Sequence, residues 1–152
     1  MLFRFEPYLL EDEFSDVPLW SSLQADFLDE APAGYATALH CFSRAALRYY
    51  LPAYLIADLR GGLTRAEPAL ALWSGFDDET RETAVNPRRY GAWTWFEAKA
   101  QRFELFTREE VEAIVAYLEF VAVRERFSRA GIEQALRNYW RPRRTQLANR
   151  RR

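Results

Sequence analysis

One apolar segment with marked ends, residues 42–62, constrains the fold of this chain more than any other feature. Ser43 is a residue type that caps helix N-termini with its side chain, and Gly61 and Gly62 supply the left-handed conformation that commonly ends a helix. Pro52, in the middle, lacks a backbone donor, so it either kinks this helix or begins a second one. Nothing in the segment suggests a reaction centre, and we interpret it as core.

The clearest helix signal lies in residues 107–127. Thr107 followed three residues later by Glu110 forms a capping box, in which each side chain satisfies the backbone N–H of the other residue. The apolar positions that follow form two adjacent stripes, and a face this wide indicates a helix packed by neighbours on more than one side. The stripes are Val111, Ile114, Val115, Leu118, Val121 and Ala122, and beside them Tyr117, Phe120, Arg124 and Phe127.

Shorter helices are predicted elsewhere. Helical spacing recurs after Trp20 and after about Ala92, acidic residues suggest a short helix over 74–82, and a last helix over 128–140 is expected to end at Pro142. Ser128 is the expected cap of this last helix, and a Glu133–Arg137 pair is expected on its surface.

The chain length sets the domain prediction. A chain of 152 residues, 49% of them apolar, buries about 70% of its unfolded surface as one domain. We predict a mainly α fold, a single compact domain of five to seven helices over residues 1–140, followed by an Arg-rich C-terminal tail over 141–152. The alternative is an α+β fold with a small sheet near Phe3 or Trp93.

Charge is polarised along the chain, although the net charge is only −1. Residues 1–30 carry eight acids and one arginine, whereas residues 137–152 carry seven arginines and no acid. The simplest interpretation is that the two ends attract each other or keep the protein in solution. The alternative is nucleic-acid association, in which arginines contact phosphates and a tryptophan stacks on a base. The residues for such contacts are Trp140, Arg141, Arg143 and Arg144.

A second cluster of arginine and aromatic residues occurs between residues 88 and 95. This composition is enriched at protein interfaces. The favoured interpretation is nevertheless core packing, with arginines stacked on the rings, and the interface is the alternative. The candidate interaction surface consists of Arg88, Arg89, Tyr90, Trp93 and Trp95.

Motifs for catalysis or metal binding are weak. His40 and Cys41 are the only residues of their types, and neighbours in sequence point apart, so a thiol–imidazole pair is disfavoured. A zinc site of the usual nitrogen and sulfur type is excluded within one chain. The acids at 77–82 lack the spacing of a calcium loop and are interpreted as a solvated helix start. We therefore expect no cofactor and no metal.

The segment Arg48-Tyr49-Tyr50-Leu51-Pro52-Ala53, with Leu39, Phe42, Tyr54 and Leu55 around it, resembles the Phe-Arg-Tyr-Tyr-Leu-Pro-Ala signature of a family of small bacterial proteins of unknown function. Leu47 stands where the signature has an aromatic residue. A second block is similar to that family at Phe103-x-Leu-Phe-Thr-x-x-Glu, with Ala113, Ile114, Tyr117 and Leu118. The resemblance implies a bacterial, cytoplasmic, mostly helical domain and brings no activity with it.

We expect a non-enzymatic module that binds another protein, in the cytoplasm and away from membranes. Abundant aromatic residues, polarised charge and the lack of a catalytic set favour this function. Nucleic-acid association through the C-terminus is the alternative. An enzyme of unknown reaction is the second alternative, and it would use a polar network of Arg48, Tyr49 and Tyr50.

Overall fold

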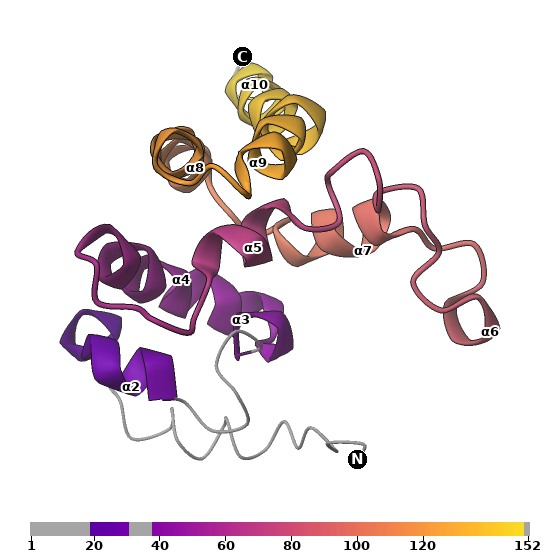
Figure 1. Cartoon of the computed structure of the whole chain (residues 1–152). Helices are drawn as coiled ribbons and strands as arrows, with labels where there is room; N and C mark the ends of the chain where they lie inside the picture. The colour runs from indigo at the N-terminus through magenta and orange to yellow at the C-terminus, as the bar shows by residue number, and fades with distance from the viewer. Residues whose placement is uncertain (1–18, 31–37, 151–152) are drawn as a thin grey trace. The chain divides into compact units, whose positions relative to one another are not determined.

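The computed structural model describes residues 19–30 and 38–150, and this part of the chain is mainly helical (Figure 1). The mainly α prediction is confirmed. Within these ranges no strand forms, and the region around Trp93 contributes only one antiparallel bridge, between Ala84 and Thr94. The other place suggested for a sheet, Phe3, lies outside the described residues.

Residue contacts group the chain into two units, residues 1–71 and residues 72–152. In the first unit, the sequence signals of the long apolar segment are confirmed. The Ala46 N–H donates to Ser43 Oγ over 3.2 Å, and Gly61 has φ 71°. Pro52 lies inside one helix, so no second helix begins there. The elements of this unit are η1 (Trp20–Ser22), α2 (Ala25–Glu30), α3 (Ala38–Cys41) and α4 (Arg44–Leu59), and α5 (Pro68–Trp73) crosses the boundary.

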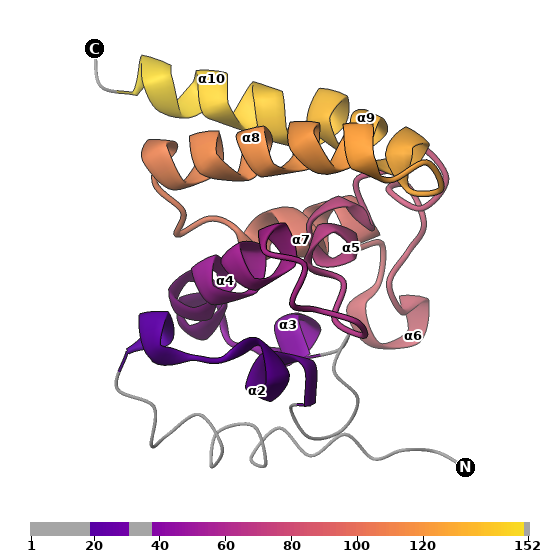
Figure 2. The same cartoon turned by 60° about the vertical axis from the view of Figure 1, so that its left-hand side comes forward.

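The second unit is built around α8 (Arg108–Arg124), which carries the predicted capping box. It packs along a helical run formed by α9 (Arg129–Ala135), the π-helix η2 (Leu136–Trp140) and α10 (Arg141–Asn149), and Figure 2 shows this run lying beside α8. Two short helices precede α8, namely α6 (Pro87–Tyr90) and α7 (Trp95–Arg102).

Pro142 does not end the last helix, contrary to the sequence prediction. The π-helix before it widens the turn, so that the Arg141 N–H donates to the carbonyl of Leu136, five residues back. Pro142 then stands in the first turn of α10, where its missing N–H is tolerated. The residues expected as an Arg-rich tail are therefore helical from 141 to 149.

Three local predictions are wrong. Residues 74–82 form turns instead of a short helix, because Asp77 folds back to accept hydrogen bonds from Thr80 and from the Gly75 N–H. Ser128 makes no side-chain cap. Glu133 pairs with Arg129 at 2.8 Å, while Arg137 reaches Asp78 at 2.6 Å.

Aromatic rings form the centre of the second unit. Phe76 stacks on Tyr139 with ring centroids 4.1 Å apart and an interplanar angle of 3°. Trp140 is fully buried, meets Phe76 and Phe103 edge-on, and donates from Nε1 to the Leu72 carbonyl over 2.9 Å. These rings fix η2 against the segment that follows α5.

Close packing at Gly131 yields a first prediction. A Cβ at this position would lie 2.7 Å from two atoms of the Trp73 ring, which cannot bend away as a flexible side chain can. We expect Gly131→Ala to lower the free energy of unfolding by about 1 to 3 kcal/mol, measured by urea denaturation. In a Trp73→Leu background the same substitution should cost much less. A gain of about 0.5 to 1 kcal/mol, the usual result for a glycine in a helix, would contradict this contact.

Candidate functional site

The segment 81–96 forms a closed loop that presents its aromatic side chains to solvent. The Val85 N–H donates to the Trp93 carbonyl and the Trp95 N–H to the Thr83 carbonyl, both over 2.9 Å. At the tip, Asn86 caps α6 through the Arg89 N–H, and Gly91 ends it with φ 64°. Figure 1 shows α6 set apart from α7. The loop is therefore held by backbone bonds, which leaves its side chains available for contacts.

The predicted interaction residues come together on this loop, and we call Arg88, Arg89, Tyr90, Trp93 and Trp95 the aromatic–arginine surface. Tyr90, Trp93 and Trp95 are 47%, 42% and 39% exposed, so the rings are not core residues. The Arg89 guanidinium lies 5.3 Å from the Tyr90 ring centroid, so an arginine does contact a ring here, but on the surface and not in the core-packing arrangement interpreted from the sequence. Three large exposed rings beside two exposed arginines are typical of a protein interface.

A capping box that was not predicted from the sequence begins α7 at the end of this loop. Thr94 and Glu97 form a capping box, in which the Glu97 N–H donates to Thr94 Oγ1 and the Thr94 N–H donates to Glu97 Oε2. The spacing Thr-x-x-Glu is visible in the sequence and would have moved the helix start from Ala92 to Trp95. The cap matters because it fixes Trp93 and Trp95 on either side of Thr94.

Three charged side chains are buried in the described part of the chain: Asp29, Asp77 and Lys99. Asp29 and Lys99 were not singled out from the sequence, and Asp77 was interpreted as part of a solvated helix start, which its burial contradicts. Burial alone would raise the pKa of Asp77, but hydrogen bonds from Thr80 and Gly75 outweigh it and lower the pKa below its usual range. Burial, with the Arg102 charge, lowers the pKa of Lys99 to about 7. Its side chain packs on Gly75, and its Nζ lies 5.9 Å from the Phe103 ring centroid.

The polar residues of the signature lie on α4. The rings of Tyr49 and Tyr50 meet edge-on with centroids 4.9 Å apart, and Tyr50 also contacts Phe42. Tyr49 is exposed, whereas Arg48 and Tyr50 are half-buried, and burial raises the pKa of Tyr50. The two tyrosines are therefore not enclosed among apolar neighbours.

The candidate nucleic-acid residues do not share one surface. Trp140 is in the interior, so its ring is not available to stack on a base while this fold is intact. Arg141 pairs with Glu119 at 2.9 Å, and Arg143 donates to Gln146 and to the Glu104 carbonyl. Arg144 is half-buried on the same helix.

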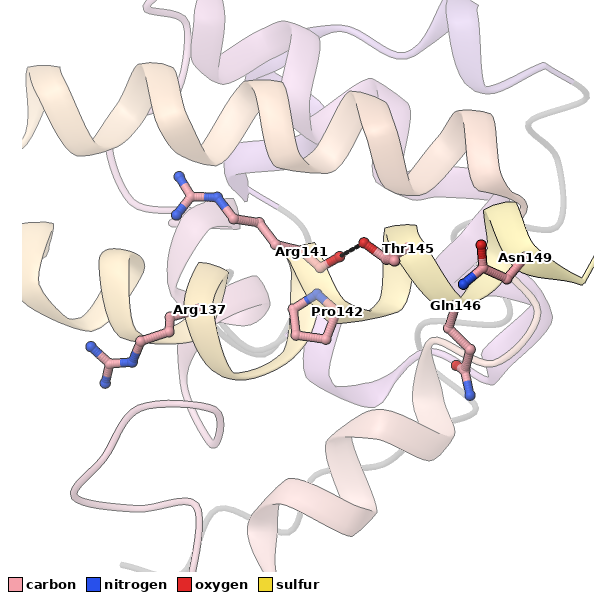
Figure 3. A pocket seen from close by; sticks show the side chains of 6 residues that line it. All are labelled: Arg137, Arg141, Pro142, Thr145, Gln146 and Asn149. Atoms are coloured by element: carbon pink, nitrogen blue, oxygen red, sulfur yellow. Dashed lines mark hydrogen bonds between the residues drawn. The ribbon is translucent and has the colours of Figure 1, made fainter.

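An open depression of about 700 Å³ lies along η2 and α10 (Figure 3). Its arginines, Arg137 and Arg141, are paired with Asp78 and Glu119. The other side chains are neutral, and Thr145 donates its hydroxyl to the Arg141 carbonyl. The positive charge of the depression is thus partly neutralised. Its lining consists of Arg137, Arg141, Pro142, Thr145, Gln146 and Asn149.

The other candidate residues for catalysis or metal binding do not form a site in the part of the chain that the structure describes. His40 is exposed and Cys41 half-buried on α3. Among the residues that the structure describes, no three His, Cys, Asp or Glu side chains are grouped to hold a metal ion. None of the helices in the described ranges has the length and apolar character needed to cross a membrane.

The model of one protein family, described as a family of unknown function (DUF6714), matches residues 10–144, and the chain belongs to this family. The match extends over both blocks of the resemblance found in the sequence. Neither the curated proteins nor the solved structures contain a match.

Proposed function

We propose that this member of a family of unknown function is a protein-binding module, and that the aromatic–arginine surface is its contact. The observation that carries the proposal is the exposure of Tyr90, Trp93 and Trp95 on a loop whose backbone is closed by its own hydrogen bonds. Rings held in this way lose little conformational freedom on binding, and aromatic and arginine side chains contribute most of the binding energy at interfaces.

The charges around the surface favour a protein over a nucleic acid as partner. Arg88 and Arg89 supply positive charge on α6, but exposed acids, Glu79, Glu82 and Glu97, belong to the same stretch of chain. Such a mixed field weakens attraction to a polyanion and suits a protein surface that combines apolar area with a few carboxylates. The buried position of Trp140 supports the same choice, because it removes the ring from the nucleic-acid alternative.

The test compares two double variants that each replace two apolar side chains of similar fractional exposure. Tyr90→Ser with Trp93→Ser changes the proposed surface, and Leu59→Ser with Leu105→Ser, at residues 48% and 45% exposed, is the matched control. Each protein is immobilised and exposed to nuclease-treated lysate of the source cells at low and high salt. We expect one protein to be retained at high salt by the wild type and the control and to be reduced at least tenfold by the surface variant.

Two outcomes would overturn the proposal. Equal retention by both double variants would place the contact elsewhere, provided that circular dichroism shows both folded. Binding that disappears after nuclease treatment and falls steeply with salt would transfer the function to nucleic acid, and the arginines of α10 would then be the first residues to change.

A further inference from the structure

The α8 helix carries a second apolar face that is exposed. Its buried face includes Val111, Ile114, Leu118 and Val121. On another side of the helix, Phe120 and Val123 are 53% and 81% exposed, and Phe127, just after the helix, is fully exposed. The apolar stripe expected to have neighbours on more than one side is therefore exposed at Phe120 and Phe127, and the Arg124 guanidinium of the same helix lies 5.9 Å from the Phe120 ring centroid.

This exposed face has regular spacing. Its residues, which we call the α8 seam, are separated by three and four positions in alternation, and all are exposed. Spacing of this kind is the a and d pattern with which two helices pack side by side. The seam consists of Ala113, Ala116, Phe120 and Val123. Phe127 follows Glu125, which is extended and ends the helix, so it lies beyond the seam.

The order of small and bulky side chains along the seam favours a second copy of this helix that lies antiparallel to the first. The small residues, Ala113 and Ala116, stand in its first half, and the bulky ones follow. If a second copy of α8 lies antiparallel about a two-fold axis between Ala116 and Phe120, Ala113 faces Val123 and Ala116 faces Phe120 of the other copy. Each small side chain then meets a bulky one, which allows dense packing on both sides of the axis.

The charges beside the seam agree with the same arrangement. Residues 108–112 carry three glutamates and one arginine, and residues 124–126 carry two arginines and one glutamate. Glu112 is paired with Arg108 at 2.9 Å and Arg124 with Glu125 at 3.1 Å, which leaves net negative charge at the beginning of the seam and net positive charge at its end. In an antiparallel pair the acidic end of one helix lies against the basic end of the other. The two helix dipoles also point in opposite directions, which brings their opposite partial charges together. A parallel pair would place like charges together.

We propose that the α8 seam is a self-association surface, on which a second copy of this chain docks its own α8 antiparallel to form a two-fold dimer. This inference is independent of the aromatic–arginine surface, which lies on a different segment of the second unit.

The first experiment is sedimentation of the full chain over a range of concentrations. We expect a dimer for the wild type and for the control Leu105→Glu, and at least a tenfold increase in the dimer dissociation constant for Val123→Glu. Because Val123 is 81% exposed, the variant should fold, which circular dichroism checks. A monomeric wild type at 100 μM, or a dimer unaffected by Val123→Glu, would overturn the proposal.

Cross-linking then tests the direction of the helices. In a Cys41→Ser background, Ala113→Cys with Val123→Cys should form disulfide-linked dimers, because the two positions face each other only between antiparallel copies. Ala113→Cys alone should not. Efficient linkage of the single variant would indicate a parallel pair and contradict the proposal. Reversing one charge, with Glu109→Arg or Arg126→Glu, should weaken the dimer, and combining both should restore it.

Discussion

Asp29→Ala should lower the free energy of unfolding by about 3 kcal/mol, the expected loss for a buried carboxylate with several hydrogen bonds. Asp29 lies on α2 and is 7% exposed. Its two oxygens accept from the Thr64 N–H and hydroxyl, the Arg65 N–H and the Ala66 N–H, at 2.5 to 2.9 Å. Alanine would leave these donors without their acceptor. The carboxylate thus ties α2 to the loop that follows α4, where Gly62 also approaches Ala25.

The matched control for Asp29 is Asp26→Ala on the same helix, at an exposed position. Urea denaturation should show a change below about 0.5 kcal/mol for this control, as for most surface substitutions. Asp29→Asn should fall between the two, because it keeps one acceptor oxygen. An Asp29→Ala protein as stable as the Asp26→Ala protein would show that the hydrogen bonds contribute no net stability.

The same carboxylate predicts acid sensitivity. Burial would raise the pKa of Asp29, but the hydrogen bonds from Thr64, Ala66 and Arg65 outweigh it and hold the pKa far below the ordinary value of 3.8. The unfolded chain therefore binds a proton at a pH where the folded chain does not. The stability that Asp29 contributes is complete above pH 3.8 and decreases as the pH falls below that value.

Lys99→Met should raise the free energy of unfolding at pH 7 by an amount on the order of 3 to 5 kcal/mol, given the depth of the pKa shift. Lys99 is 5% exposed, and burial with the Arg102 charge lowers its pKa from 10.5 to about 7. Between pH 7 and 10.5 the unfolded chain binds the proton and the folded chain does not, so the stability of the wild type rises with pH over this range. The gain from methionine is therefore largest at or below pH 7 and shrinks toward pH 10.5.

Lys99 is the only lysine in the chain, so its titration is directly observable. In protein labelled with ¹³C-lysine, the single Cε resonance should shift with a midpoint near pH 7. Lys99→Arg is the control, because arginine keeps the buried charge and should give no stabilisation. A midpoint near 10.5 would mean that the ammonium group reaches solvent, and Lys99→Met should then change stability little.

Prediction from sequence succeeded where the signal was local. Ser43 and Thr107 cap their helices through contacts three residues away, and Gly61 adopts the left-handed conformation expected after α4. Prediction failed where a residue distant in sequence formed the contact that was expected from a near neighbour. Arg137 reaches Asp78 instead of Glu133, because Gln134 and Asn138 of the same helical run also bind Asp78 and hold it nearby.

The candidate surface illustrates the same limit. The composition of residues 88–95 suggested either an interface or core packing, and only the exposure of Tyr90, Trp93 and Trp95 separates the two. Trp140 shows the reverse case, since a tryptophan beside arginines suggested a stacking platform, yet its ring is fully buried. Local composition states which contacts a ring can make, whereas burial depends on residues that are distant in sequence.

The sequence by itself determined the helical class, the capped ends of α4 and α8 and the membership of the family, because these depend on spacing within a few turns or on motifs along the chain. The tertiary structure decided which charges are buried and which rings face solvent. Asp29 finds its partners 35 to 37 residues away, and the Lys99 side chain packs on Gly75, which precedes it by 24 residues. Such contacts leave no periodic pattern in the sequence, because they form only when separate elements pack together and exclude water.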